Sequence, residues 1–188
     1  IKQTSTASSS EKSHLPVAAD TAAAIVPLYA KGYTVKYLPD HVRLVDIHDP
    51  QKENGNTFHY ALVPKGIKPA GVPDDYTVIE TPVEHVMCMT SLQLSNFIRL
   101  DACDCVVGIT STRHLFNKEM NDRLKSGETV KIGIEGNFDN EVIMSMNPDV
   151  IFISPFKRGG YDAMREIGIP LVPHLGYKEM TRWGRPNG

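Results

Sequence analysis

The chain has 188 residues, 41% of them apolar, and its 20 Lys and Arg against 22 Asp and Glu give a net charge of −2. A chain of this size can bury one hydrophobic core without metal ions or disulfides to staple it. The near-neutral charge and the lack of a long basic run argue against nucleic-acid binding, and no apolar run approaches the ~18 residues of a membrane span.

The chain begins with a polar segment. Residues 1–16 are rich in Ser, Thr and Lys, which predicts a flexible tether. Such a start fits either the sequence that follows a removed secretory signal or an artificial boundary. After it, Asp20 is placed to cap a short helix over residues 22–28.

The next segment alternates apolar and polar residues, the pattern of strands with one exposed face. It predicts strands at 33–37, 41–47 and 58–63, with turns at Pro39-Asp40 and at Asn54-Gly55-Asn56. Three consecutive strands joined in this way form an antiparallel meander over residues 33–63. A Gly- and Pro-rich loop, residues 64–75, follows it.

From residue 76 the pattern changes to short apolar runs that alternate with helical segments. The runs lack polar alternation, so we expect strands that are buried on both faces. Strands and helices that alternate at this spacing predict βαβ units, and therefore a Rossmann-like parallel sheet flanked by helices over residues 76–177. The expected strands are 86–89, 105–109, 130–133, 150–153 and 170–172, and the expected helices are 92–101, 115–124, 140–146 and 161–167. Residues 17–177 then form one α/β lobe.

A parallel sheet binds ligands outside the carboxyl ends of its strands, which selects five loops. These loops carry hydroxyl, cationic and aromatic side chains, a set that suits an anionic or flat aromatic ligand. The residues singled out as ligand contacts are Thr90, Ser91, Ser111, Thr112, Arg113, Asn137, Phe138, Ser154, Phe156, Lys157, Arg158, His174 and Tyr177. Each of them has an ordinary alternative as a surface or core-edge residue.

Markers of enzyme chemistry are weak. The chain has no dinucleotide-binding GxGxxG, no phosphate loop and no GxSxG nucleophile elbow. It also lacks the CxxC and HxxxH spacings of a zinc site, and we interpret its three cysteines as small core residues. We therefore expect no catalytic residues and no resident cofactor.

Three segments carry a resemblance to a known family: 106–110 (VVGIT), 136–141 (GNFDNE) and 147–153 (NPDVIFI). Together they resemble the amino-terminal lobe of periplasmic substrate-binding proteins of ABC importers for iron-siderophores, haem and cobalamin. The resemblance covers about residues 76–177. It implies two α/β lobes joined by one long helix, a metal-chelate ligand held between them, and delivery to permease and ATPase subunits. It also implies a periplasmic location, with a lipid anchor upstream as a further expectation.

The resemblance also implies individual roles. Glu141 matches the acid that docks each amino-terminal lobe onto permease arginines, although an acid in a first helical turn is also stabilising by itself. For a haem ligand, His174 and Tyr177 are the expected axial ligands. For a ferric siderophore, Arg113 and the pair Lys157 and Arg158 would meet its negative charge.

The chain departs from the family at its end. Residues 178–188 should begin the linker helix, but two glycines and a proline stand within five residues there. We therefore expect a truncation or a shifted reading frame, with self-association through the apolar face of a missing second lobe. Two alternatives remain open: a metal-dependent enzyme on a Rossmann-like sheet, using His174, His114 and a carboxylate, and a non-catalytic interaction domain.

Overall fold

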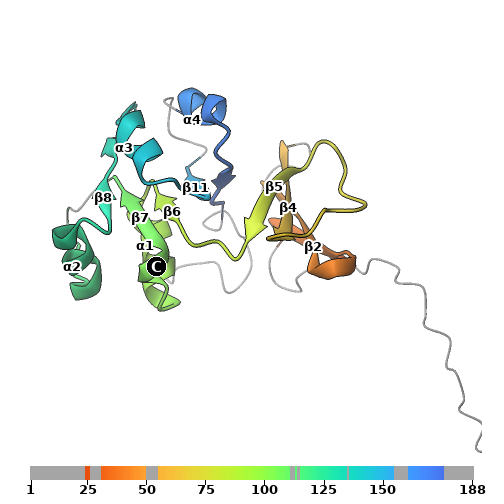
Figure 1. Cartoon of the computed structure of the whole chain (residues 1–188), viewed down its shortest axis with the longest axis horizontal. Coiled ribbons are helices and arrows are strands. Elements are labelled where there is room, and N and C mark those ends of the chain that lie inside the picture. Colours follow the sequence, from red (N-terminus) through yellow and green to blue (C-terminus); the bar gives the residue numbers. More distant parts are fainter. Residues whose placement is uncertain are drawn as a thin grey trace, which may run out of the picture.

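The computed structural model describes residues 24–25, 31–49, 55–110, 113, 115–134, 136–154 and 161–175. Two five-stranded sheets lie beside each other, with the helices gathered around the second sheet (Figure 1). The expected tether (1–16) and the expected start of a linker helix (178–188) lie outside the described residues. Within the described part, none of the helices combines the length and the apolarity that a membrane crossing requires.

The first sheet contains the predicted meander. Its order is β1 (Ala24–Ile25), β2 (Tyr33–Tyr37), β3 (Arg43–His48), β4 (Thr57–Pro64) and β5 (Thr77–Thr81). The pairs from β1 to β4 are antiparallel, whereas β5 runs parallel to β4. The helix expected over residues 22–28 is wrong at residues 24–25, because Ala24 and Ile25 pair with β2 as an edge strand. The rest of that helix falls outside the described residues.

Alternation along β3 and β4 sorts their side chains onto two faces. Leu44, Ala61 and Val63 pack on one face, which Val72 and Tyr76 of the loop after β4 cover. Val45 and Tyr60 lie on the other face, which looks toward the second sheet. The first sheet is therefore covered on both sides.

The second sheet is parallel throughout. Its order is β12 (Leu171–Pro173), β11 (Val150–Ile153), β6 (Val86–Cys88), β7 (Val106–Ile109) and β8 (Val130–Lys131). Its central strands are buried on both faces, as their unbroken apolar runs predict. The sequence-based fold class, an antiparallel meander followed by a parallel sheet with helices, is confirmed.

Helices cover both faces of this sheet. Leu94 of α1 (Ser91–Arg99) and Met120 of α2 (Lys118–Ser126) belong to the cluster on one face. Ile143 of α3 (Asn140–Ser145) and Met164 of α4 (Asp162–Ile167) belong to the cluster on the other. In Figure 1, α3 and α4 accordingly lie above the sheet and α1 and α2 below it.

Small residues allow close packing between these layers. A Cβ at Gly108 of β7 would lie 2.8 Å from Met87 Cγ and 2.9 Å from Ile132 Cγ2, so only glycine fits without a shift. Cys88 and Cys103 are buried free thiols, which agrees with their interpretation as small core residues. Burial raises the pKa of the Cys88 thiol to about 12.

The two sheets contact each other through an apolar cluster. Tyr60 and Ile79 of the first sheet pack with Val150 of the second. The Tyr60 hydroxyl also donates a hydrogen bond of 2.5 Å to the carbonyl oxygen of Leu171 in β12. Next to this contact lies an apolar crevice of about 290 Å³. The meander is thereby fastened to the edge of the parallel sheet.

Candidate functional site

The order of the parallel strands reverses beside β6. The chain passes from β6 to β7 and β8 on one side, and later adds β11 and β12 on the other. Loops that leave neighbouring strands in opposite directions open a crevice at the carboxyl edge of a sheet, and ligands bind there. The loops after β6 and β11, at Met89–Ser91 and Ser154, flank this switch point. We call the five loops after β6, β7, β8, β11 and β12 the rim.

Thr90 serves the rim as a helix cap. Its hydroxyl accepts a hydrogen bond of 3.3 Å from the backbone N–H of Gln93, and the Gln93 side chain reaches back to the cap. The Gln93 Oε1 atom accepts bonds of 3.1 Å from the Thr90 N–H and 2.8 Å from the Met89 N–H. This reciprocal capping box begins α1 at the switch point. Ser91, the next residue, is exposed.

The loops after β6, β7 and β8 are tied to one another. The Thr110 hydroxyl donates a bond of 3.0 Å to the carbonyl oxygen of Met89. The Ile132 N–H donates a bond of 3.0 Å to the carbonyl oxygen of Ile109. These bonds hold this side of the rim in a fixed arrangement. Arg113, which follows in the loop after β7, is exposed.

His174 lies against helix α1. Its backbone N–H donates a bond of 3.0 Å to the carbonyl oxygen of Ile153, and its ring Nε2 lies 3.4 Å from the Asn96 side-chain nitrogen. Burial lowers the pKa of His174, which favours a neutral ring at pH 7. With Nε2 accepting from Asn96, the ring proton is assigned to Nδ1. Metal ligation through Nε2 would require the Asn96 contact to break.

Phe138 contributes to the core at the edge of the rim. Its ring stacks on that of Tyr161, with 5.6 Å between centroids, and it packs against the cluster under α3 and α4. Asn137 is exposed beside it in the hairpin of β9 (Gly133–Ile134) and β10 (Asn137–Phe138). The hairpin is tight, because a Cβ at Gly133 would lie 2.6 Å from the Asn137 carbonyl oxygen.

Three exposed apolar side chains at the rim were missed by the sequence reasoning. Leu92 follows β6, Phe116 follows β7 and Ile134 follows β8, with 48%, 87% and 67% of their surface exposed. Leu92 lies in the first turn of α1, Phe116 directly precedes the Asn117 cap of α2, and Ile134 lies in β9. Each therefore stands in the segment that follows a strand of the parallel sheet, and that position was the signal available in the sequence. The rim is therefore more apolar than we expected.

The other expected residues divide into two groups. Ser154 is half-buried at the end of β11, and Glu141 is exposed in the first turn of α3, after the Asp139 cap. The second group lies outside the described residues, and its roles stay predictions: Ser111, Thr112, His114, Phe156, Lys157, Arg158 and Tyr177.

Among the described residues, no group of three or more His, Cys, Asp or Glu side chains is placed to hold a metal ion.

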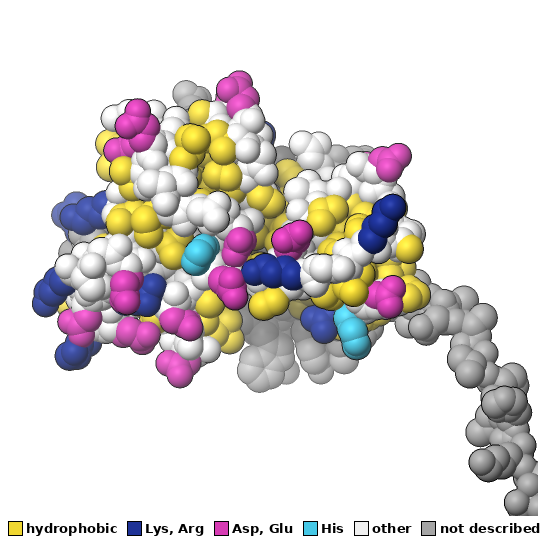
Figure 2. Space-filling model, in the orientation of Figure 1, with side chains coloured by type: hydrophobic (Ala, Val, Ile, Leu, Met, Phe, Trp, Pro, Cys, Tyr) yellow, Lys and Arg dark blue, Asp and Glu magenta, His cyan; other side chains and the backbone are white. Residues whose placement is uncertain are grey.

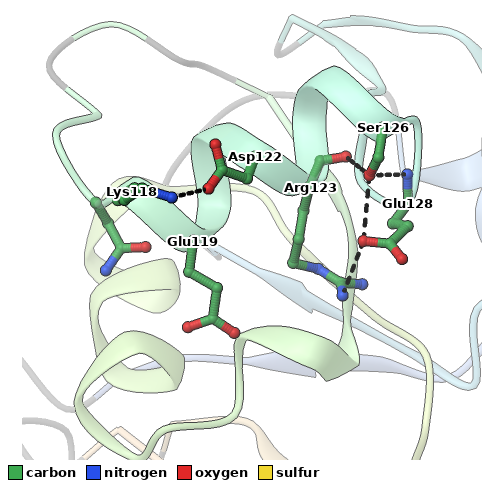
Figure 3. A pocket seen from close by; sticks show the side chains of 7 residues that line it. Lys118, Glu119, Asp122, Arg123, Ser126 and Glu128 are labelled. Atoms are coloured by element: carbon green, nitrogen blue, oxygen red, sulfur yellow. Dashed lines mark hydrogen bonds and ion pairs between the residues drawn. The ribbon is translucent and has the colours of Figure 1, made fainter.

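A separate polar hollow of about 720 Å³ lies beside α2 (Figure 3). Four of the five charged groups that line it form two ion pairs. Lys118 Nζ lies 2.5 Å from Asp122 Oδ2, and Glu128 Oε2 lies 3.5 Å from the Arg123 guanidinium and 3.1 Å from Ser126 Oγ. On the face shown in Figure 2, cationic and anionic side chains are likewise interspersed, both at the margin and in the middle. The rim is the better candidate site.

No protein-family model matches the chain. A curated relative, the uncharacterized lipoprotein MJ0878 of Methanocaldococcus jannaschii, is 25% identical over 180 residues. The match covers 84% of this chain and 42% of the relative. The chain thus spans less than half the length of that relative.

Three solved structures are similar over part of the chain. The periplasmic haem-binding protein RhuT of Roseiflexus sp. RS-1 is 20% identical, covers 48% of this chain and 33% of its own, and has a TM-score of 0.39. The molybdate periplasmic binding protein MolA of Haemophilus influenzae is 19% identical, covers 54% of this chain and 34% of its own, and has a TM-score of 0.43. The petrobactin-binding protein YclQ of Bacillus subtilis is 17% identical, covers 69% of this chain and 37% of its own, and has a TM-score of 0.42. The chain is similar to binding proteins of this class, which its sequence also resembles.

Proposed function

We propose that the chain is the solute-binding lobe of an ABC importer component, which captures its ligand at the rim. The observation that carries this proposal is the switch point between β6 and β11, where the capped start of α1 follows β6 at the carboxyl edge of the sheet. The hydroxyls of Thr90 and Thr110 are committed to holding loops. A rim fixed in this way supports binding of a ligand rather than its chemical conversion.

The ligand class follows from what the rim exposes. Leu92, Phe116 and Ile134 offer apolar surface, and Arg113 offers a cation. A large ligand with an apolar face and an anionic edge fits this combination. Haem, cobalamin and ferric siderophores are metal chelates of this kind. Among them, haem would draw on the imidazole of His174.

We further propose a membrane permease with its ATPase as the partner and the periplasm as the location. Glu141 supports the first part, because its carboxylate is exposed and free to meet an arginine of another protein. The name of the relative, a lipoprotein, supports a lipid anchor in the full-length protein.

A thermal-shift experiment tests the binding proposal. The chain is heated with haem, cobalamin, a ferric siderophore or molybdate. Ligand at about 100 times its Kd stabilises the native state by about 2.7 kcal/mol. For a domain of this size, the Tm should rise by about 5–10 °C. No rise with any of the four ligands, for a chain that melts cooperatively, would count against the proposal.

Variants then locate the site. Leu92→Ser and Arg113→Ala should each reduce the shift, because both remove exposed rim groups. Arg99→Ala is the matched control, since Arg99 is exposed at the opposite end of α1. Equal losses in all three variants would place the ligand elsewhere.

The docking proposal has its own test. Glu141→Ala should lower uptake and leave ligand binding unchanged, whereas Glu166→Ala, at an exposed position on α4, should lower neither.

A further inference from the structure

A polar cluster fastens the loop after β4 to the first sheet, away from the rim. Asp46 of β3 stands opposite His59 of β4 in the strand register. The two other members, Asp75 and Tyr76, end the loop of residues 65–76 that covers this face of the sheet. We call Asp46, His59, Asp75 and Tyr76 the loop clasp.

Asp46 is the acceptor at the centre of the clasp. Its Oδ1 atom lies 2.6 Å from His59 Nδ1 and accepts a bond of 2.7 Å from the Tyr76 hydroxyl. The Thr34 hydroxyl approaches its Oδ2 atom at 3.5 Å. Burial by itself would raise the pKa of Asp46, but the hydrogen bonds from Tyr76 and His59 outweigh it and hold the pKa below its ordinary value. Asp46 is therefore a carboxylate at any pH near neutrality.

The ring of His59 lies between two carboxylates. Because Asp46 is ionised, the 2.6 Å contact requires the proton of a neutral ring to sit on Nδ1. The Nε2 lone pair then faces Asp75 Oδ2 at 3.9 Å, which is a repulsive arrangement. Protonation of Nε2 turns this repulsion into an ion pair. The His59 and Tyr76 rings also lie together, with centroids 4.9 Å apart, so the ring is held in place while its charge changes.

We propose that the clasp is a pH-sensitive fastening of the 65–76 loop, closed most firmly when His59 is protonated and loosened when it is neutral. The charged and titratable groups around His59 are Asp46 and Lys36 from the strands and Asp75 and Tyr76 from the loop. Loosening would uncover the apolar cluster of Val42, Leu44, Ala61 and Val63.

Hydrogen exchange of the loop amides tests the proposal. The Ile67 and Tyr76 N–H groups donate to the carbonyl oxygens of Pro64 and Pro73, each at 3.1 Å, so their protection reports how well the two ends of the loop stay ordered. Protection factors, corrected for intrinsic exchange, are compared at about pH 5 and about pH 8. A half-exposed ion pair of this kind should lower protection about two- to fivefold at the higher pH.

Three variants decide the outcome. His59→Gln should abolish the pH dependence and Asp75→Asn should reduce it, whereas His48→Gln, on β3 of the same sheet, should leave it unchanged. The proposal is overturned if the wild-type chain shows no pH dependence or if His59→Gln retains it. Should His59→Gln fail to melt cooperatively, the exposed Asp75→Asn carries the test, and an unchanged pH dependence in that variant overturns the proposal.

Discussion

The capping box at the switch point predicts a measurable loss of stability when Gln93 is replaced by Leu. Gln93 is buried, with 3% of its surface exposed, and its Oε1 accepts from two backbone amides. Leu is similar in size but has no acceptor. A buried N–H left without a partner costs about 1–3 kcal/mol.

The two amides do not contribute equally. The Met89 N–H also lies 3.3 Å from the carbonyl oxygen of Phe152, so it keeps one partner in the variant. The Thr90 N–H has Gln93 as its acceptor and is only partly buried. We therefore expect a total loss of about 1–3 kcal/mol, the range for one orphaned donor. This corresponds to a fall in Tm of about 2–12 °C for a chain of this length.

Urea unfolding followed by circular dichroism measures the loss. Gln93→Glu should restore most of the stability near neutral pH, because a carboxylate also accepts both bonds and is favoured near a helix N-terminus. Ser95→Ala is the control on the same helix, since its hydroxyl donates to the Leu92 carbonyl at an exposed position. A loss below about 0.5 kcal/mol in Gln93→Leu, the range of ordinary surface substitutions, would refute the reasoning.

Three further predictions concern the framework around the site. Tyr60→Phe removes the bond to the Leu171 carbonyl and should lower the free energy of unfolding by about 1 kcal/mol in urea titrations. Burial by itself would raise the pKa of Asp149, but hydrogen bonds from two backbone N–H groups outweigh it and lower the pKa. The ionised carboxylate therefore stabilises the native state above the unfolded-state pKa, and this stabilisation is lost as the pH falls through the folded-state pKa. Urea midpoints should accordingly fall more steeply on acidification in the wild type than in Asp149→Asn. Gly108→Ala presses a methyl group onto Met87 and should cost about 1–3 kcal/mol, and an unchanged Tm would contradict the close packing of β7.

The parallel sheet was predictable from sequence because its signal is strong. The run Val150–Ile153 has no polar residue, and a strand of that kind is stable only when both faces are covered. The structure places that strand as expected, with a neighbour on each side. The edge strand at Ala24–Ile25 was not predictable in the same way. Two residues give no periodicity, and the pairing with β2 that decides their structure is a tertiary contact.

The parallel strands bring the five loops to one edge of the sheet, as the sequence predicted, whereas the ligand contacts of their side chains stay predictions. The position of a loop follows from strand direction, which the sequence specifies. Whether a hydroxyl faces a ligand or a backbone amide depends on local geometry. Thr90 and Thr110 both turn inward to hold loops, and Phe138 turns onto Tyr161. Periodicity alone does not encode these choices.

Under the proposed function, the bonds that Thr90 and Thr110 make to backbone groups shift ligand recognition onto other side chains of the rim. The exposed residues Ser91, Leu92, Arg113 and Phe116 stand at the described rim, whereas the hydroxyls of Thr90 and Thr110 bond to backbone groups. A preformed apolar surface loses little conformational freedom when a ligand binds, so its affinity comes mainly from buried area. A site of this composition should discriminate ligands by shape and apolar area first and by charge second. A small hydrated oxyanion such as molybdate would then stabilise the chain less than a macrocyclic chelate.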